Sequence, residues 1–496
     1  MILFIVAKLV TTTQWLAHLG TFGAFHTLAV PFRKALHNIR QDLSRVRTPG
    51  SFARNSFHVF SGNSLAMVSQ VILTPIVARI YGPEAYGIYG LFAALMMNLA
   101  SFGDLGYSMA YVLPKEEERF LGLVRLNLAL ILFVCVAFEI VALFSNQLYS
   151  VLPGWAPLGG WIHFVAPVAL CYALAVMATQ WLTRVKKFKQ SAFTGATTDI
   201  AMRLFNLFYG LYSAGRVHGL IIGEVIMRTA IIPVYARSLW DQGLREIRSG
   251  WTWERLRRIA IEYKRYPLLI FPERWVSLLG AQLPIFLLAS DLSTVGHYSL
   301  GASLLLMPLR LLGFSMSTVY LQRASEIAVQ APEELKRITK GLFDRLFWIG
   351  IGPFLLLVFF ADEAFALVFG EPWRAAGVAT AYLGGFFFLR LLTEPMVSLF
   401  NVVGREHVML VFQIILNIVR LVAMVLVIQA GAGSAMVILC YGVVSLLGYA
   451  VLSVYLLNIA HLNGFAITLR AMVIMGVVSA LVAALRWSIF GSWVPA

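Results

Sequence analysis

Acidic residues and cysteines are scarce in this chain, and charged residues of any kind are few. Only 13% of the 496 residues are charged, with 24 acidic residues against 39 lysines and arginines, whereas 59% are hydrophobic. A mean hydropathy of +0.79 excludes an ordinary soluble domain. No P-loop, HExxH or CxxC sequence occurs, so the chain carries no nucleotide-driven motor of its own. The three cysteines, Cys135, Cys171 and Cys440, lie in apolar runs without a pairing pattern, and no disulfide, metal or cofactor is expected.

Apolar runs long enough to cross a bilayer recur along nearly the whole chain. A transmembrane helix needs about 20 mainly apolar residues. We expect one helix in each of thirteen runs: 58–80, 86–113, 120–144, 161–183, 193–214, 217–237, 266–290, 295–321, 345–369, 376–400, 408–430, 434–457 and 466–486. The sequence therefore predicts an all-α polytopic membrane protein.

The positive charge of the chain, formally +15, is concentrated in every second loop. Basic residues fill 31–57, 184–189, 237–265 and 322–345, whereas the loop 145–160 contains none. This alternation is the positive-inside pattern, and it indicates that the basic loops are cytoplasmic. The charge therefore reports topology, and we expect no nucleic-acid partner.

Residues 1–57 precede the first predicted span, and we interpret them as an amphipathic or cytoplasmic extension. Residues 1–30 are moderately apolar but lack the leading charge and the small-residue cleavage site of a signal peptide. They fit a marginal helix, an interfacial segment or an over-long start. Residues 33–47 are basic and amphipathic, which suits contact with anionic lipid headgroups.

An internal repeat relates the two halves of the chain. Displaced by 209 positions, residues 75–117 align with 284–326 without a gap, and ten of the 43 positions are identical. The shift carries the first span onto the seventh, and an even number of helices keeps both halves in the same orientation. We expect two six-helix lobes related by a parallel repeat, plus one or two extra helices. The expected parts are the extension 1–57, the N-lobe 58–240 (helices 1–6), a basic cytoplasmic linker 241–265, the C-lobe 266–459 (helices 7–12) and an additional helix in 460–496.

Six arginines fall roughly at mid-depth in the predicted spans. Placing one arginine at a bilayer centre costs about 2.5–3.5 kcal/mol on insertion scales, so these helices must face protein or water. Three of the arginines have an acid four residues away on the same helix face, which fits either a neutralised pair or a pair that exchanges partners during transport. All six are candidate substrate-binding residues: Arg203 (with Asp199), Arg228 (with Glu224), Arg390 (with Glu394), Arg274, Arg310 and Arg420.

Arg274, Arg310 and Arg420 have no acid at that spacing, and Glu273, adjacent to Arg274, points about 100° away from it on a helix. An unpaired guanidinium in a low-dielectric interior is costly, so each needs water, a partner on another helix or a substrate anion. The planar guanidinium suits bidentate phosphate binding. Substrate contact and an interhelical ion pair both remain open.

The acids Asp104, Glu139 and Glu273 are the candidate gating or ion-coupling groups, with a structural, hydrogen-bonded Asp104 as the alternative. Asn63 and Gln70 are seven residues apart in the first span, hence on one helix face, and are candidate cavity-lining residues. Small polar residues also join helices in membranes, which is the alternative for this pair.

Prolines interrupt the first, seventh and eighth spans, and Pro75 and Pro284 occupy equivalent repeat positions. Proline removes a backbone hydrogen bond and bends a helix. These positions fit hinges around a central cavity, although proline is also frequent in membrane helices.

The string R-x-Y-G-P-E-x-Y-G-x-Y at 79–89 and the G-D-L-G turn at 103–106 mark residues 74–118. This segment resembles the helix 1–helix 2 region of polysaccharide flippases (O-antigen, lipid-linked oligosaccharide type) in the multidrug/oligosaccharidyl-lipid/polysaccharide exporter superfamily. The resemblance implies a bacterial inner-membrane flippase that moves an undecaprenyl-diphosphate-linked oligosaccharide for lipopolysaccharide or other surface polysaccharide biosynthesis. It also implies a cationic cavity lined by helices 1, 2, 7 and 8, which favours Arg274 and Arg310 as pyrophosphate or acidic-sugar contacts. The implied partners are the lipid-linked oligosaccharide, the bilayer and polysaccharide polymerase or assembly proteins.

Two other functions compete with this interpretation. A drug or cation exporter of the same superfamily would need an acidic interior, whereas the arginines inside the spans outnumber the plausible acids. A polytopic glycosyltransferase or polymerase would carry its catalytic residues in large external loops, whereas 81–85, 291–294 and 430–433 are short. We therefore expect a flippase that works by alternating access and is not an enzyme.

Overall fold

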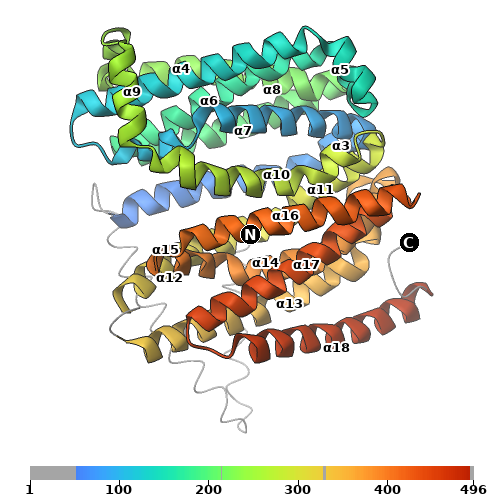
Figure 1. Cartoon of the computed structure of the whole chain (residues 1–496). Coiled ribbons are helices and arrows are strands. Elements are labelled where there is room, and N and C mark those ends of the chain that lie inside the picture. The colour runs from blue at the N-terminus through green and yellow to red at the C-terminus, as the bar shows by residue number, and fades with distance from the viewer. Residues whose placement is uncertain (1–51, 214, 328–330, 492–496) are drawn as a thin grey trace.

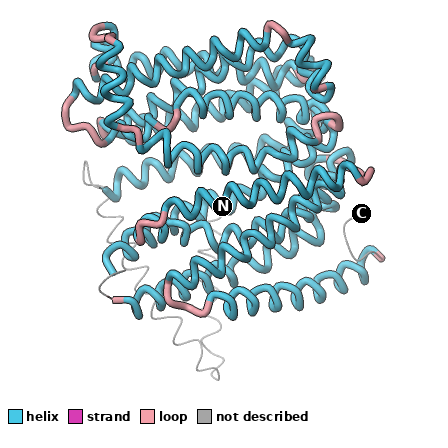
Figure 2. The backbone as a smooth tube through the Cα atoms, viewed as in Figure 1, coloured by secondary structure: helices cyan, strands magenta, loops and turns pink. Residues whose placement is uncertain are grey.

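The computed structural model describes residues 52–213, 215–327 and 331–491, and every regular element in these ranges is a helix. Most of the predicted extension, residues 1–51, lies outside the described residues. The helices run nearly side by side, and their connections gather at the two ends of the bundle (Figures 1 and 2). The fold is that of a multi-pass membrane protein.

The first half of the described chain forms the upper part of Figure 1. Gly82, with φ of 73° and ψ of 171°, divides the long element α3 into two helices. The elements are α3 (Phe52–Asp104), η1 (Tyr107–Val112), α4 (Glu117–Ala142), α5 (Ser145–Val151), η2 (Pro153–Trp161), α6 (Ile162–Arg184), α7 (Phe188–Ser213), α8 (His218–Leu239), η3 (Trp240–Gln242) and η4 (Leu244–Arg248). We call α3–α8 the N-lobe.

The second half begins with the amphipathic α9 (Trp253–Glu262), on the same end of the bundle as the basic loops. It continues with η5 (Tyr266–Ile270), α10 (Phe271–Leu287), α11 (Leu292–Pro308), η6 (Leu309–Gly313), α12 (Phe314–Ile327), α13 (Pro332–Phe369), η7 (Glu371–Trp373), α14 (Arg374–Thr393), η8 (Glu394–Ser398), α15 (Leu399–Val402), α16 (Glu406–Gln429), α17 (Ser434–Ile459) and α18 (Gly464–Phe490). We call α10–α17 the C-lobe. The helix α18 lies outside it, against α13 and α17 (Figure 1).

Each predicted span contains a helix, but several helices are broken where the apolar run continues. The second span ends at Asp104, because Leu105 and Gly106 take positive φ values of 44° and 78°. The eighth span divides into α11 and α12 around η6, a π-helical turn that directly follows Pro308. A hydropathy profile does not detect these breaks, because the residues on both sides of each break are apolar.

The repeat is visible as a pair of reciprocal contacts between the lobes. A Cβ atom added to Gly87 would lie 1.9 Å from the Leu292 carbonyl oxygen, and one added to Gly296 would lie 1.9 Å from that of Pro83. Gly87 and Gly296 are equivalent in the repeat, as are Pro83 and Leu292. The two lobes therefore meet around a local twofold axis, and only glycine allows this backbone approach. This confirms the predicted parallel arrangement of two lobes.

Nine segments of the described chain are long and apolar enough to cross a membrane by composition alone. The helices α7, α10, α11 and α12 are not among them. Charged residues interrupt α7 and α10, and α11 has only 17 residues before the π-helical turn. Three of these four helices carry, or end just before, a predicted arginine: Arg203 in α7, Arg274 in α10 and Arg310 just beyond α11.

Candidate substrate path between the lobes

Two arginines of the C-lobe reach the boundary with the N-lobe. Arg310 lies in the π-helical turn η6, is exposed, and is within electrostatic range of Asp199 on α7. Arg274 lies in the first turn of α10, just after the π-helical turn η5; it is exposed and is within electrostatic range of Asp104. π-Helical turns inside helices often mark functional sites. Each arginine therefore lies in or next to a π-helical turn of the C-lobe and within electrostatic range of an acid of the other lobe.

Within the described part of the chain, neither of these arginines has a carboxylate in hydrogen-bond contact. Arg274 donates to the Met109 thioether at 2.7 Å, a weak acceptor. Among the side chains that the structure describes, none accepts a hydrogen bond from Arg310. The third such arginine, Arg203 on α7, donates only to the backbone oxygen of Asp199 at 3.1 Å. These three guanidinium groups therefore keep most of their hydrogen-bonding capacity among the described residues.

Two of the three predicted i,i+4 pairs are formed as ion pairs. Arg228 Nε lies 2.9 Å from Glu224 Oε1, and the second oxygen of that buried carboxylate accepts from Tyr89 Oη at 3.0 Å. Arg390 Nε lies 3.2 Å from Glu394 Oε2 in the C-lobe. In the third pair the Asp199 carboxylate accepts no hydrogen bond from the described side chains, and it lines a cavity of about 350 Å³ between α3, α6, α7 and α8.

Arg420 was expected to need water, a partner on another helix or a substrate anion, and the structure gives it a neutral partner on another helix. It is 3% exposed inside the C-lobe, where Nε donates to Ser445 Oγ at 2.8 Å and Nη1 to Asn417 Oδ1 at 3.1 Å. Its guanidinium lies 5.3 Å from the Phe386 ring centre and 4.8 Å from that of Tyr441. Neutral acceptors and aromatic faces surround the charge, and the buried Nη2 has no acceptor among the described atoms.

Two neighbours of Arg420, Asn417 and Tyr441, bind the backbone of α10 next to its proline. Pro284 has no N–H, so the Gly280 carbonyl lacks its intrahelical donor, and Tyr441 Oη donates to that oxygen at 3.1 Å. Asn417 Nδ2 donates to the Val276 carbonyl at 2.6 Å, one turn earlier. At this repeat position the predicted hinge is thus bound to α16 and α17.

The predicted acids divide between the boundary and the lobe surface. Asp104 accepts from Ser108 N at 3.1 Å, Ser108 Oγ at 2.9 Å and Asn127 Nδ2 at 2.9 Å, so it stabilises the G-D-L-G turn as well as facing Arg274. Glu273 is within electrostatic range of Arg274 and of Glu394.

The other predicted residues lie away from these charges or outside the described side chains. Glu139 pairs with His163 of α6 at 2.6 Å, and both are 38% exposed, away from the boundary arginines. Gln70 is half-buried in the first helix of α3, and no described residue hydrogen-bonds to its side chain. The side chain of Asn63 lies outside those that the structure describes.

Sequence reasoning missed a polar and aromatic contact between α3 and α10. Asn98 Nδ2 donates to Gln282 Oε1, and Asn98 Oδ1 accepts from Trp275 Nε1 at 3.0 Å. The rings of Phe102 and Trp275 lie 4.7 Å apart. Neutral amides and aromatic side chains inside apolar runs give no distinctive sequence signal.

A second missed contact joins the lobes at the end of the bundle opposite α9. We call this the outer end, because the basic loops that are expected to be cytoplasmic lie at the other end. Arg79 of α3 donates to the Leu367 carbonyl at 2.6 Å and to that of Val368 at 3.1 Å, at the C-terminus of α13. In return Trp373 Nε1 donates to the Ala78 carbonyl at 3.0 Å. Each lobe therefore satisfies carbonyl groups at a helix end of the other, where such groups lack intrahelical donors. We call these residues, with Tyr86, whose ring packs edge-on against Trp373 at 5.1 Å, the outer latch.

A model of the family described as "Polysaccharide biosynthesis protein" matches residues 76–377, more than half of the chain. The chain belongs to this family. The match begins inside the first helix of α3 and includes the whole 79–89 string, whose Arg79 and Tyr86 form the N-lobe side of the outer latch. The string on which the resemblance depends is thus a contact between the lobes. No curated protein matches the chain significantly.

Solved structures of low sequence identity share the fold of this family member. The structure titled "Lipid II flippase MurJ, inward closed conformation" has a TM-score of 0.62 and 15% identity, covering 88% of this chain and 97% of that one. A multidrug resistance MATE family transporter of the MOP superfamily, inward-facing, has a TM-score of 0.60 and 14% identity, covering 84% and 99%. The MATE multidrug transporter DinF-BH gives a TM-score of 0.55 and 17% identity, covering 85% and 97%. These likenesses show the fold alone.

Proposed function

We propose that the protein is a flippase that moves a polyprenyl-diphosphate-linked oligosaccharide across the bacterial inner membrane for surface polysaccharide synthesis. The family match supports the polysaccharide context, and the fold is one used by a lipid II flippase and by exporters. The observation that carries the proposal is the set of under-bonded arginines at the lobe boundary. It favours an anionic headgroup over a cationic drug.

The charges at the boundary are more nearly balanced than the sequence suggested. Glu224, Glu394 and Asp104 already have donors, and the first two are each paired with an arginine. The remaining groups are three arginines, each with five N–H donors, against two carboxylates that accept no described hydrogen bond: Arg203, Arg274 and Arg310 against Asp199 and Glu273. Asp104 has only neutral donors and keeps its negative charge, so these three arginines and the three carboxylates balance. The excess is in N–H donors, which suits a diphosphate.

Transport in this proposal proceeds by exchange of partners. In the structure Arg310 faces Asp199 and Arg274 faces Asp104, so charges of opposite sign attract across the boundary. A diphosphate that enters between the lobes replaces those acids as the partner of the two arginines, through bidentate N–H···O contacts. The attraction between the lobes is then replaced by attraction to the headgroup, which frees the lobes to rock while the lipid tail stays in the bilayer.

In this cycle the outer latch keeps the outer side of the protein closed until the headgroup is released. It joins the lobes at the outer end, so release of the headgroup requires that Arg79 and Trp373 leave their carbonyl partners. Small coupled changes of this kind, in which one interface opens as another closes, are typical of rigid-body transitions. Net transport then follows from loading on the inside and release on the outside.

The test is flipping of a fluorescent polyprenyl-diphosphate oligosaccharide in proteoliposomes by wild type, Arg310→Gln and Arg274→Gln. Loss of a hydrogen-bonded contact to a charged group costs about 1.5–3 kcal/mol, so we expect each variant to flip roughly 10- to 100-fold more slowly. Arg310→Lys keeps the positive charge but not the planar guanidinium that binds in a bidentate manner, and we expect an intermediate flipping rate.

The matched control is Arg470→Gln, which removes one exposed positive charge from α18, away from the boundary. We expect it to flip at the wild-type rate. Wild-type flipping by folded Arg310→Gln and Arg274→Gln together would contradict the proposed substrate path. Transport of cationic dyes but not of the lipid would instead favour an exporter.

A further inference from the structure

The helix α18 is an addition to the two six-helix lobes, and it meets the rest of the protein at few polar points. Most of its surface is unburied and apolar, as expected of a helix that faces lipid. Toward the inner end its Thr468 hydroxyl lies 2.9 Å from that of Ser453 on α17. Toward the outer end it is held by Arg486, which is 2% exposed.

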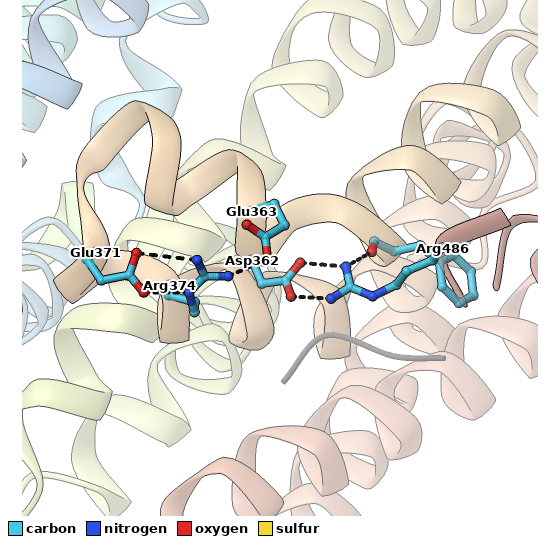
Figure 3. Close-up of polar contacts among 6 residues, drawn as sticks. Asp362, Glu363, Glu371, Arg374 and Arg486 are labelled. Carbon is cyan, nitrogen blue, oxygen red and sulfur yellow. Dashed lines mark hydrogen bonds and ion pairs between the residues drawn. The ribbon is translucent and has the colours of Figure 1, made fainter. Parts of the chain in front are cut away.

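Arg486 forms a bidentate ion pair with Asp362 of α13. Nη1 lies 2.8 Å from Oδ1 and Nη2 lies 2.5 Å from Oδ2, and Nη1 also donates to the Phe359 carbonyl (Figure 3). Both side chains are at most 2% exposed. Two parallel hydrogen bonds between planar groups fix orientation as well as distance. An apolar helix such as α18 does not need a buried ion pair in order to insert into the membrane. Buried ion pairs add little to stability but can fix the position of the elements that they join. We therefore interpret the Arg486–Asp362 pair as one that fixes the position of α18 against α13.

The next residue of α13 holds the segment that carries the outer latch. Glu363 Oε1 lies 2.5 Å from Arg374 Nη1, and Arg374 Nε lies 2.7 Å from Glu371 Oε1 (Figure 3). Trp373, between these two residues, donates to the N-lobe through its indole. Adjacent residues on a helix point about 100° apart, so one turn of α13 is bound on two faces, by α18 and by the start of α14.

The same end of α13 receives the other half of the latch. Arg79 donates to the carbonyls of Leu367 and Val368, five and six residues after Asp362. Both latch contacts therefore depend on where the outer end of α13 lies. Among the described residues, no other ion pair on the lipid-facing side of α13 holds that turn in place.

We propose that α18 positions the outer latch through the Arg486–Asp362 ion pair, and that Asp362 and Arg486 are positioning residues for the opening of the outer side. With the pair intact, α13 presents its terminal carbonyls to Arg79, and Glu363 keeps Arg374 and Trp373 in place. When the pair is lost, the outer end of α13 shifts toward lipid and both latch contacts weaken together. This inference goes beyond the proposed substrate, because it concerns only the opening equilibrium.

The experiment measures the distance across the latch in the full-length protein. Spin labels are attached at Glu84→Cys and Ser293→Cys, which are exposed, repeat-equivalent positions on the two lobes, after the three native cysteines have been replaced. We expect the ratio of open to closed distances to rise in Asp362→Asn by a factor between about 5 and 150, the usual range of coupling between sites. Glu363→Gln should change it in the same direction.

Two variants keep the test decisive. Asp362→Leu/Arg486→Met replaces the pair with apolar groups, which usually preserves folding, and we expect it to fold and to show the raised open population. Thr468→Val removes the hydrogen bond between α18 and Ser453 of α17 and should leave the distances unchanged. If the folded double variant shows the wild-type distances, or if Thr468→Val opens the latch equally, the proposal is wrong. Because no substrate is added, failure of the proposed flippase function would leave this result unaffected.

Discussion

The two lobes accommodate arginines among their helices in different ways: both form an i,i+4 ion pair, and the C-lobe also buries an arginine, Arg420, without a described carboxylate. In the N-lobe Arg228 is paired with Glu224, which also accepts from Tyr89. In the C-lobe Arg420 contacts the Tyr441 ring, which packs against Tyr298, the repeat equivalent of Tyr89. No carboxylate contacts Arg420 among the described residues.

The difference shows what the duplication has preserved. Tyr89 and Tyr298 occupy equivalent positions in the repeat, and each lies near the centre of its lobe that holds an arginine. The carboxylate that pairs with the arginine in the N-lobe, Glu224, has no counterpart beside Arg420 among the described residues. The N-lobe centre is neutral and keeps Arg228 within electrostatic range of Asp199 at the boundary. The C-lobe centre retains a net positive charge and uses its neutral members to hold the α10 backbone at Pro284. We infer that the N-lobe centre adjusts charge at the boundary and that the C-lobe centre fixes the shape of α10.

The largest loss of stability is expected when Arg228 of the N-lobe is left without its carboxylate partner. In Glu224→Gln, Arg228 loses its carboxylate and Tyr89 loses a charged acceptor. Removing one partner of a buried ion pair usually costs about 3–5 kcal/mol, so we expect a sharp fall in the yield of folded protein and in its thermal stability in detergent. Glu224→Gln/Arg228→Met should recover most of the loss. Equal stability of Glu224→Gln and wild type would show that the ion pair is not maintained in the membrane.

A smaller effect is expected when the C-lobe cation is removed. Arg420→Met leaves only the neutral groups Ser445 and Asn417 without a donor, at a cost of about 1–3 kcal/mol, partly offset because no unpaired charge remains buried. The protein should fold, and its thermal stability should fall by less than in Arg228→Met, which strands Glu224. A larger loss in Arg420→Met than in Arg228→Met would reverse the assignment of the two centres.

The helices and the repeat could be predicted from the sequence, because both depend on patterns of composition that extend over many residues. The orientation rests on the same kind of pattern and stays a prediction. Charge at i,i+4 spacing also predicted the Glu224–Arg228 and Arg390–Glu394 ion pairs. The partners of Arg420 could not be predicted, since Ser445 and the ring of Tyr441 come from another helix and resemble ordinary apolar-span residues. Asp362 and Arg486 are 124 positions apart, and nothing local in either span indicates the other.

The outer latch shows a different limit. The string 79–89 was conspicuous as a family resemblance, yet its chemistry is directed at backbone carbonyls, which every residue has. Arg79 binds the end of α13, and Ala78 accepts from Trp373. Apart from the Tyr86–Trp373 ring contact, the described partners are backbone carbonyls, which leave no complementary side-chain pattern. Close approach at Gly87 and Gly296 is similar, because it depends on the absence of a side chain. A sequence motif can therefore mark a contact between lobes without revealing what it contacts.

The finest comparison between the lobes is the pair of repeat-equivalent tyrosine hydroxyls. Tyr89 Oη donates to the Glu224 carboxylate at 3.0 Å, and Tyr298 Oη donates to the Ala281 carbonyl at 2.6 Å. Hydrogen bonds to charged groups contribute about 1.5–3 kcal/mol and neutral ones about 0.5–1.5 kcal/mol, so Tyr89→Phe should destabilise the protein more than Tyr298→Phe. Thermal unfolding of the two single variants and of the double variant measures this difference directly. Because the hydroxyls contact different partners in different lobes, their effects should add within about 0.3–0.5 kcal/mol. A larger departure from additivity would mean that the two centres are coupled across the boundary, and the division of roles between the lobes would then fail.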